Sequence, residues 1–291
     1  MKMFYFDRAP NYGDALNPWM WPRLLGDRLQ PNSPTLFLGI GTILKVGLPQ
    51  AERYAVLGTG GGYEAFPKTD HRWNFYGVRG PLTAKALGLE PHLSAIDGAY
   101  FLRKFSLPEP DAAGPRIGFM PHWQTTLSTP WQSICDRSGL RYLDPSLPVD
   151  EVLRQIRGCQ GVIAEAMHAA ITADALRIPW LPVKLGAQFL DFKWRDWLGS
   201  IEVDATPVAL PAVRPLYCER VHESAFRRSC RELINPVANH FQIRALTAHL
   251  RRLRKDFEAN PQLGHVSTDR ALNAGMDRLQ RGLDRLLTCE N

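Results

Sequence analysis

An acid and a histidine lie three residues apart in Gly161–Leu176, where an apolar strand is expected to run directly into an alanine-rich helix. Glu165 and His168 therefore fall at the start of that helix, where backbone N–H groups attract anions. A histidine in this position can bind phosphate or transfer a proton near neutral pH. The alternative is a histidine that only packs in the core, and the nearby acid and helix start favour the functional interpretation.

Polar side chains also follow three other expected strands. Asp14, in the segment Asn11–Asp14, precedes a helix expected to open near Asn17-Pro18, and it could either act on a hydroxyl as a base or simply cap the turn. Arg79 ends a strand just ahead of a helix, so its guanidinium can bind a carboxylate or a phosphate there. His122 ends a further strand. We expect all three to face the ligand crevice of a parallel sheet.

A basic and aromatic loop is expected after the last expected strand. Lys184 closes that strand, and Lys193, Trp194, Arg195 and Trp197 come shortly after it. Aromatic and basic side chains together can bind single-stranded nucleic acid, but a sheet edge or a core uses the same residues equally often. We therefore expect no nucleic-acid partner from this segment.

The segment Gly58–Tyr63, GTGGGY, follows an expected strand, which is where a phosphate-binding turn belongs. It departs from the dinucleotide fingerprint, because Tyr63 replaces the third glycine and no ribose-binding acid lies about 20 residues further on. We therefore expect no nicotinamide cofactor. Gly60, Gly61 and Gly62 are either phosphate ligands or parts of a tight turn without a ligand.

Short apolar segments alternate with helical ones over the first two hundred residues. The expected strands are Met3–Phe6, Thr35–Gly39, Tyr54–Gly58, Asn74–Val78, Arg116–Met120, Gly161–Glu165 and Trp180–Lys184. The expected helices are Pro18–Gly26, Pro81–Ala86, Pro130–Ser138, Val149–Arg157 and Ala166–Leu176. This alternation indicates an α/β fold with parallel sheets. Residues 103–115, rich in proline and charge, separate an N-terminal domain, 1–108, from a second domain, 109–205.

Residues 206–291 are expected to form a basic helical region. Apolar residues recur every three to five positions between Phe241 and Phe257, and basic residues occupy much of the remaining surface. Of the net charge of +6, residues 214–291 carry +5, from 14 Lys and Arg against 9 Asp and Glu. Nucleic acid, an anionic membrane surface or solubility alone could each account for this charge.

The composition of the 291 residues is that of a soluble globular chain, with 45% hydrophobic and 22% charged residues. No apolar stretch reaches the length of a membrane span, and Asp7 and Arg8 interrupt the N-terminus where a signal peptide needs its apolar core. We therefore expect a cytoplasmic protein. The five cysteines form no C-x-x-C pair, so we expect free thiols, with neither a disulfide framework nor a metal site.

Five segments in order resemble the polysaccharide pyruvyl transferase family, most closely its exopolysaccharide ketolase branch of the succinoglycan type. They are Asn11–Asn17 (NYGDALN), Gly58–Gly62 (GTGGG), Val78–Thr83 (VRGPLT), Asp97–Ala99 (DGA) and Glu165–Pro179. Asn17–Arg23 and the Glu-Ala-Met-His at 165–168 carry the resemblance to that branch. The similarity extends over residues 3–200, and the order and spacing of the five segments make it fairly specific.

The resemblance implies a GT-B-like fold, in which two Rossmann-like domains face each other across a cleft, here with a helical C-terminal extension. It implies a transferase that moves pyruvate from phosphoenolpyruvate onto two hydroxyls of a sugar, forming a pyruvate ketal and releasing phosphate. The acceptor would be the terminal sugar of a lipid-linked exopolysaccharide repeat unit. The resemblance implies no metal or other cofactor, since phosphoenolpyruvate itself is the donor.

The same resemblance implies roles for the polar residues. His168 and Arg79 are expected to bind phosphoenolpyruvate, with His168 or His122 giving a proton to its methylene carbon. Asp14 or Glu165 would accept the proton of the sugar hydroxyl.

One position departs from the family's pattern. The Arg-Leu-His sequence of the family corresponds to residues 166–168, Ala-Met-His, so the arginine is missing here. Another cation must replace it, and we rank Arg79 ahead of Lys184 and Arg195. Asn11 and the three glycines Gly60, Gly61 and Gly62 complete the expected binding residues.

Two other functions fit parts of the sequence. A GT-B glycosyltransferase with a nucleotide-sugar donor would share the fold and would need a late acid, such as Asp191 or Asp196, to hold the ribose. A non-enzymatic basic adaptor for nucleic acid or membrane would leave the polar loops unexplained, so we rank it third. In the enzyme, the basic helices could hold the chain at the inner face of an anionic membrane, pair two subunits in a homodimer, or pack on the domains.

Overall fold

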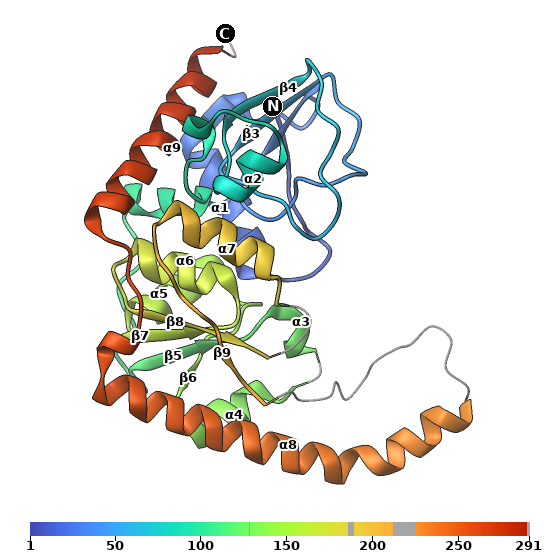
Figure 1. Cartoon of the computed structure of the whole chain (residues 1–291), viewed down its shortest axis with the longest axis vertical. Helices are drawn as coiled ribbons and strands as arrows, with labels where there is room; N and C mark the ends of the chain where they lie inside the picture. The colour runs from blue at the N-terminus through green and yellow to red at the C-terminus, as the bar shows by residue number, and fades with distance from the viewer. Residues whose placement is uncertain (128, 186–188, 212–224, 290–291) are drawn as a thin grey trace.

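Two parallel sheets form the body of the molecule (Figure 1). The computed structural model describes residues 1–127, 129–185, 189–211 and 225–289, with the side chains of the last range described from residue 240 on. The first sheet has the strand order β1-β2-β3-β4 and the second the order β6-β5-β7-β8-β9. All the strand pairs in these described ranges are parallel, so the expected α/β class is confirmed.

The elements follow one another in the order that the alternation predicts. In the first half they are β1 (Lys2–Phe4), α1 (Tyr12–Leu25), η1 (Gly26–Arg28), β2 (Thr35–Leu38), β3 (Arg53–Leu57), β4 (Trp73–Gly77), α2 (Pro81–Ala86), η2 (Pro91–Leu93) and η3 (Gly98–Lys104), where η marks a 3₁₀-helix. In the second half they are β5 (Ile117–Met120), α3 (Trp123–Thr126), α4 (Trp131–Ser138), β6 (Arg141–Tyr142), α5 (Val149–Arg157), β7 (Gly161–Ala164), α6 (Met167–Ala175), β8 (Trp180–Lys184), α7 (Asp191–Ser200) and β9 (Val208–Ala209). The chain continues with α8 (Ala225–Ala259), η4 (Pro261–Leu263) and α9 (Asp269–Cys289).

All seven expected strands occur close to their expected bounds. Strands β2, β3, β5, β7 and β8 are buried apart from an end residue, as continuous apolar runs require, whereas β1 and most of β4 are only partly buried. The strands β6 and β9 escape prediction, since two residues are too few to show a pattern. Residues 103–115, which connect the two sheets, are hydrogen-bonded to the second half of the chain. Arg157 donates to the Leu107 carbonyl at 3.0 Å, and Arg141 donates to the Asp111 carbonyl at 2.8 Å.

Helix α1 begins at Tyr12, well before the start near Pro18 that the sequence suggests, so the expected start is wrong. A proline inside a helix leaves the carbonyl four residues earlier without its usual donor. Here the Asn17 side chain supplies one, since its Nδ2 donates to the Asp14 carbonyl at 3.1 Å and to the Ile40 carbonyl at 3.0 Å. Asp14 consequently lies in the first turn of a helix rather than in a loop.

Buried polar contacts join the two halves. The Tyr12 hydroxyl lies 2.9 Å from the Thr172 hydroxyl oxygen, and the Tyr100 hydroxyl donates to Asp174 at 2.7 Å. Trp197 donates from its indole nitrogen to the Tyr100 oxygen at 3.3 Å. One hydrophobic cluster continues from the first half into the second. The relative placement of two domains in a GT-B fold stays a prediction.

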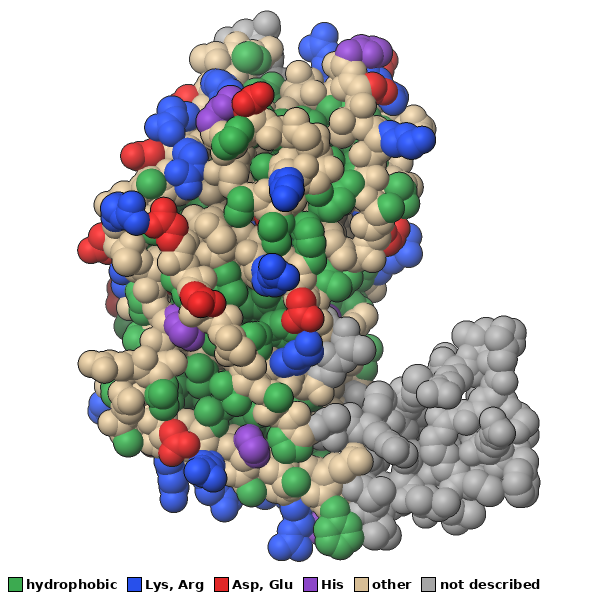
Figure 2. All heavy atoms as spheres, viewed as in Figure 1, with side chains coloured by type: hydrophobic (Ala, Val, Ile, Leu, Met, Phe, Trp, Pro, Cys, Tyr) green, Lys and Arg blue, Asp and Glu red, His purple; other side chains and the backbone are tan. Residues whose placement is uncertain are grey.

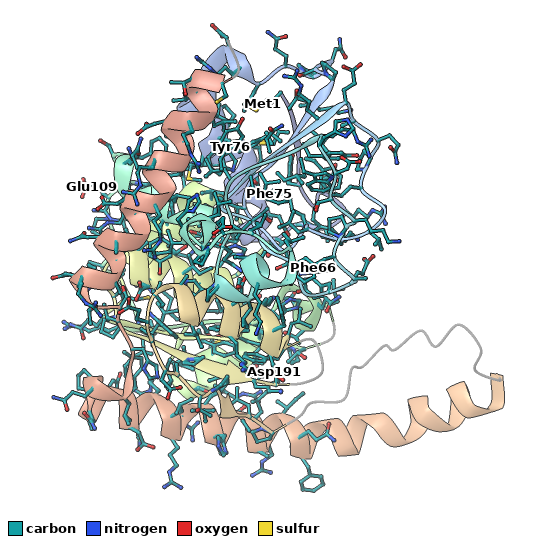
Figure 3. All side chains as sticks on the ribbon, turned by 45° about the horizontal axis from the view of Figure 1, so that its top comes forward. Met1, Phe66, Phe75, Tyr76, Glu109 and Asp191 are labelled. Carbon is teal, nitrogen blue, oxygen red and sulfur yellow. The ribbon has the colours of Figure 1, made fainter. Side chains whose placement is uncertain are left out.

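The C-terminal helices pack on both halves, so the region is helical as expected but is not a separate appendage. Leu246, Leu250 and Phe257 of α8 are buried in the cluster that covers the second sheet beside α4. Helix α9 runs back along the first half, where Arg285 donates to the Tyr76 carbonyl of β4 at 2.9 Å (Figure 3). Figure 2 shows Lys and Arg side chains along the outer side of α8. Within the described ranges, no helix combines the length and the apolarity that crossing a membrane requires.

Candidate functional site

The carboxyl ends of the two sheets meet where the start of α1 contacts the start of α6. Gly13 lies so close to the His168 ring that any Cβ at position 13 would collide with it. Beside them, Gly62 packs against Phe192 of α7, and the rings of Phe192 and Phe66 lie 5.8 Å apart (Figure 3, where Phe66 is labelled). Loops at the carboxyl ends of parallel strands are where ligands bind. Residues of both halves are therefore brought to one candidate site.

His168 lies at the start of α6, as expected, and its side chain is only 14% exposed. Its Nε2 lies 3.8 Å from Asp97 Oδ2, which is too long for a hydrogen bond, and neither atom has a hydrogen-bond partner among the described residues. Burial, helped by the positive charges of Lys193 and Arg79, lowers the pKa of His168 to about 3. The imidazole is therefore neutral at physiological pH in the ligand-free protein.

Asp97 lies next to His168, and no role is expected for it from the sequence. It is fully buried before η3, and its Oδ1 accepts a hydrogen bond from the Ala99 N–H at 2.9 Å. Burial raises its pKa to about 7, although the nearby charge of Arg79 and the Ala99 bond oppose the shift. Its place in the Asp-Gly-Ala segment, directly after the apolar Ala95 and Ile96, is the sequence feature that could have indicated a buried acid.

Asp14 and Asn11 form a unit at the start of α1. The Asn11 amide donates to Asp14 Oδ2, and only 9% of Asp14 is exposed. Burial raises the pKa of Asp14 to about 6, against the lowering effects of the Asn11 bond and of the Lys193 charge. The structure thus shows a carboxyl group that titrates close to neutrality at the contact between the halves.

His122 and Glu165 lie together at the carboxyl ends of β5 and β7. Glu165 Oε2 accepts from the His122 backbone N–H at 2.8 Å and from the Thr125 hydroxyl at 3.1 Å, so this acid positions the start of α3. The His122 ring accepts from the Gln124 N–H through Nδ1 at 3.4 Å. Burial and the Lys193 charge lower the pKa of His122 to about 3, so it too is neutral at physiological pH.

Arg79 is completely buried, and its guanidinium is engaged by the protein. Its Nε donates to Asp196 of α7 at 3.2 Å, and its Nη1 and Nη2 donate to the Gly41 and Gly61 carbonyls at 3.3 and 3.2 Å. Asp196 also accepts from the Thr83 hydroxyl at 2.6 Å. Arg79 is therefore neutralised within the fold, and it fastens the glycine segment to α7.

The three glycines form a wall of the site against this guanidinium. A Cβ at Gly60 would collide with Arg79, which is a packing reason for glycine at this position. The Gly60 N–H donates to the Gly41 carbonyl at 3.1 Å, and the Gly61 N–H donates to the Thr83 hydroxyl at 3.4 Å. Two of the three amide groups that could hold a phosphate are therefore bonded to the protein.

Lys184 and Arg195 lie apart from the histidines. Lys184 is 41% exposed, pairs with Asp191 at 3.3 Å and lies over the Phe189 ring. Arg195 is on the exposed side of α7, where it lines a surface depression with Glu202. In the part of the chain that is described, neither cation contacts His168, His122 or Asp14.

Lys193 is the cation that lies among the site residues, and from sequence it is expected only as part of a basic and aromatic loop. The expected loop is wrong, because the segment forms helix α7 and buries Lys193. This lysine is 7% exposed, and its Nζ donates to the Tyr63 hydroxyl at 3.0 Å. Its charge lowers the pKa of Asp14, His122 and His168, so all three lie within its electrostatic reach. Its spacing could have indicated burial, because Lys193, Asp196, Trp197 and Ser200 recur at three- and four-residue steps on the buried face of α7.

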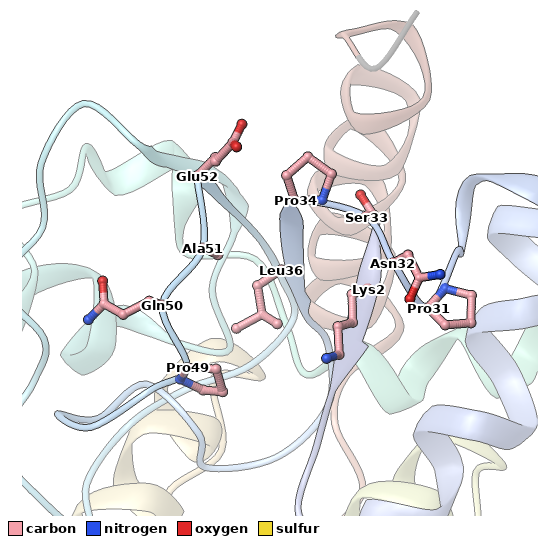
Figure 4. Close-up of a pocket in the computed structure, with 10 residues that line it drawn as sticks. All are labelled: Lys2, Pro31, Asn32, Ser33, Pro34, Leu36, Pro49, Gln50, Ala51 and Glu52. Atoms are coloured by element: carbon pink, nitrogen blue, oxygen red, sulfur yellow. The ribbon is translucent and has the colours of Figure 1, made fainter.

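The described residues contain no group of three His, Cys, Asp or Glu side chains that could hold a metal ion. Cys135, Cys159 and Cys289 are free thiols, whereas the side chains of Cys218 and Cys230 lie outside the described ones. Figure 4 shows a depression lined by Lys2, Pro34 and Glu52 among others, which precede or begin the strands of the first sheet. It therefore lies at the amino ends of those strands, opposite the candidate site.

Comparison with known proteins shows the family of the chain. A family model described as polysaccharide pyruvyl transferase matches residues 11–185. The chain is also 37% identical over 217 residues to the succinoglycan biosynthesis protein ExoV of Rhizobium meliloti (strain 1021), a match that covers 72% of this chain and 68% of ExoV. The family match includes Asn11, Asp14, Arg79, His122 and His168, and it ends before Lys193. The chain therefore belongs to the polysaccharide pyruvyl transferase family of enzymes.

Proposed function

We propose that this enzyme moves pyruvate from phosphoenolpyruvate onto two hydroxyls of the terminal sugar of a lipid-linked exopolysaccharide repeat unit. The family match supports pyruvyl transfer, and the similarity to ExoV, a succinoglycan biosynthesis protein, supports an exopolysaccharide acceptor. The observation that carries the proposal is the grouping of His168, His122, Asp14 and Lys193 where the two halves meet.

The reaction requires proton transfers and the departure of phosphate. The methylene carbon of phosphoenolpyruvate gains a proton, which makes the neighbouring carbon electrophilic. One sugar hydroxyl bonds to that carbon and loses its proton, the bond to phosphate breaks, and the second hydroxyl bonds and loses its proton. Carbon takes up one proton and the hydroxyls release two, so the remaining proton leaves with hydrogen phosphate.

His168 or His122 supplies the proton to carbon. Both are neutral without a ligand, because burial and the Lys193 charge lower their pKa to about 3. A donor that carries a carboxylate and a phosphate brings negative charge, which offsets Lys193 and raises these pKa values. The protonated histidine therefore forms when the donor binds, so protonation of the donor takes place only in the occupied site.

Asp14 is the proposed base, and Glu165 is the other candidate. With a pKa of about 6, Asp14 is mostly ionised at pH 7 and can still accept a proton from a hydroxyl during the reaction. Glu165 already holds the His122 backbone and the Thr125 hydroxyl, so Asp14 is the better placed. In the same proposal Asn11 orients Asp14, and Arg79 supports the glycine wall of the donor site.

Incubation with phosphoenolpyruvate and lipid-linked oligosaccharides tests the function. The expected products are phosphate and an acceptor whose mass has increased by a pyruvate ketal. If no galactose-ended or glucose-ended acceptor causes phosphoenolpyruvate to be consumed, the proposal is wrong.

A nucleotide-sugar glycosyltransferase is less well supported. Its ribose would need a late acid, but Asp196 is fully buried against Arg79 and Thr83, and Asp191 pairs with Lys184. A thermal-shift screen separates the two donors. We expect stabilisation by phosphoenolpyruvate and none by nucleotide sugars.

The proposal includes a place at the inner, anionic surface of the membrane, where lipid-linked acceptors are held. The exposed Arg244, Arg252 and Lys255 of α8 support it, since each cation near such a surface contributes about 1 kcal/mol. Pairing of two subunits through α8 is the other use of this surface that the proposal leaves open.

A further inference from the structure

The site holds a buried cation without a carboxylate partner. Lys193 is 7% exposed, and no Asp or Glu of the described residues lies within ion-pair distance of its Nζ, although Asp14 is near enough to feel its charge. Burying an ammonium group is costly unless an opposite charge or several hydrogen bonds compensate. The nearby Arg79 shows such compensation, because Asp196 faces its guanidinium at 3.2 Å.

The hydrogen bonding of Lys193 is also incomplete. An ammonium group has three N–H donors. Among the described residues, the Tyr63 hydroxyl at 3.0 Å is the partner of the Lys193 Nζ, which also lies 5.3 Å from the centre of the Tyr63 ring. Within those residues, two of the three donors have no partner and remain for a ligand.

Tyr63 reaches Lys193 from the other half of the molecule. It follows the glycine segment and is half exposed, whereas the lysine is buried on α7. A half-exposed phenol can move aside or turn its own O–H toward an anion, so Tyr63 both holds the lysine and can join it in binding.

We propose that Lys193, held by Tyr63, binds the phosphate group of the donor and takes the place of the arginine that the family has at position 166. The inference rests on the proposed function. A lysine suits this role because its ammonium is a compact point charge that pairs well with phosphate. It also faces the negative charge that collects on the phosphate as the bond to carbon breaks.

The position among Asp14, His122 and His168 supports the assignment. A phosphate bound to Lys193 would place the enolpyruvyl carbons close to both histidines, which are the candidate acids. Arg79, Lys184 and Arg195 are less suited, because the first is neutralised by Asp196, the second pairs with Asp191, and the third is exposed on the outer side of α7.

The test compares Lys193→Met and Lys193→Arg with the wild-type enzyme. We expect Lys193→Met to raise the KM for phosphoenolpyruvate and the inhibition constant of inorganic phosphate together, by about ten- to a hundredfold, since a charged hydrogen bond is lost. Lys193→Arg should keep both constants closer to their wild-type values than Lys193→Met does. Lys45→Met is the matched control, because Lys45 is exposed and pairs with Glu64 close to Tyr63 in the sequence. It should change neither constant.

A second variant covers the case in which Lys193→Met fails to fold. Tyr63→Phe removes only a hydroxyl from a half-exposed side chain, and it should raise both constants severalfold. A wild-type enzyme that consumes no phosphoenolpyruvate would overturn the proposed function and this inference with it. A wild-type enzyme that does consume it, with unchanged constants in the Lys193 and Tyr63 variants, would overturn the Lys193 assignment alone.

Discussion

Two cations are buried at this site, and their surroundings differ. Arg79 faces Asp196 and is bonded to backbone carbonyls on its remaining sides, whereas Lys193 faces an uncharged phenol. The charge of Arg79 is thus compensated within the fold, and it stabilises the contact between the glycine segment and α7. The Arg79 charge also reaches His168 and Asp97, whereas the charge of Lys193 reaches His168, His122 and Asp14. The comparison separates a cation that maintains the site from one that is available to a ligand.

Replacement of His168 should have the largest effect, because this residue lies in the field of Lys193 and would act on the donor. His168→Ala is expected to lower kcat/KM for phosphoenolpyruvate by about 10²–10⁴-fold, the usual contribution of a general acid. Continuous phosphate release measures it, and thermal unfolding shows whether the fold is retained. The exposed His92 is the matched control, so His92→Ala should leave the rate unchanged. Near-normal turnover with undiminished donor binding would exclude His168 from the chemistry.

The two cations should also differ in what their removal does to stability. Arg79→Met leaves Asp196 buried without its partner, so we expect a loss of about 3–5 kcal/mol in the free energy of unfolding. Lys193→Met removes a buried charge that has no ion-pair partner among the described residues and acts on Asp14 only at longer range, so stability should be unchanged or higher. Urea unfolding of both variants measures the difference.

A double variant sharpens that result. Asp196→Asn in the Arg79→Met background should recover part of the lost stability, since it removes the stranded charge. Equal losses in the Arg79 and Lys193 variants would mean that both cations are structural, and the distinction between them would fail.

Sequence patterns predicted the sheets and the position of Glu165 and His168 between a strand and a helix, but not how the charges around them are paired. The strands were predictable because each is a contiguous apolar run, and Glu165 and His168 because they follow one directly. The start of α1 was not predictable. Pro18 has no N–H to donate to the Asp14 carbonyl, and the Asn17 side chain donates to it instead, which the spacing of residues does not reveal.

The pairing of charges depends on contacts between distant segments. Arg79 meets Asp196 117 residues later, and Lys193 meets Tyr63 130 residues earlier. A sequence shows that four such residues exist, but only the fold decides which cation is neutralised. Arg79 therefore ranks first as the replacement cation from sequence alone, whereas its pairing with Asp196 in the structure leads us to propose Lys193.

The carboxyl group beside Lys193 provides a smaller, pH-dependent test. Burial raises the pKa of Asp14 from 3.8 to about 6. A carboxyl whose pKa is raised by folding stabilises the protein fully below its unfolded-state pKa, and that contribution is lost as the pH rises through its folded-state value. Asp14→Asn should therefore gain stability relative to wild type between pH 4 and pH 7, by about 2–3 kcal/mol. Unfolding curves that stay parallel over this range would show that Asp14 does not titrate near pH 6.

The basic residues of α8 also divide into cations that are bonded to the fold and cations that are exposed. Arg251 and Arg254 donate to carbonyl groups at the end of α4, at 3.1 and 3.0 Å, so they attach the helix to the second half. Arg252 and Lys255 are exposed, with only a long ion pair between Arg252 and Asp256 at 3.7 Å. The first pair is structural, and the second is free to meet an anionic surface. Deletion of α8 and α9 would not separate membrane binding from stability, because both helices contribute to the hydrophobic cores.

Charge reversal of the exposed pair isolates the second role. Arg252→Glu with Lys255→Glu should weaken sedimentation with anionic vesicles by about tenfold or more, at about 1 kcal/mol per lost cation, and leave turnover of a soluble acceptor unchanged. Lys2→Glu with Arg53→Glu makes the same change in net charge at the amino edge of the first sheet, so it controls for charge alone. Equal loss of binding in both variants would make the attraction a property of net charge rather than of α8. If neither variant changes vesicle binding but the α8 variant alters the sedimentation coefficient, the exposed cations belong to a contact between subunits.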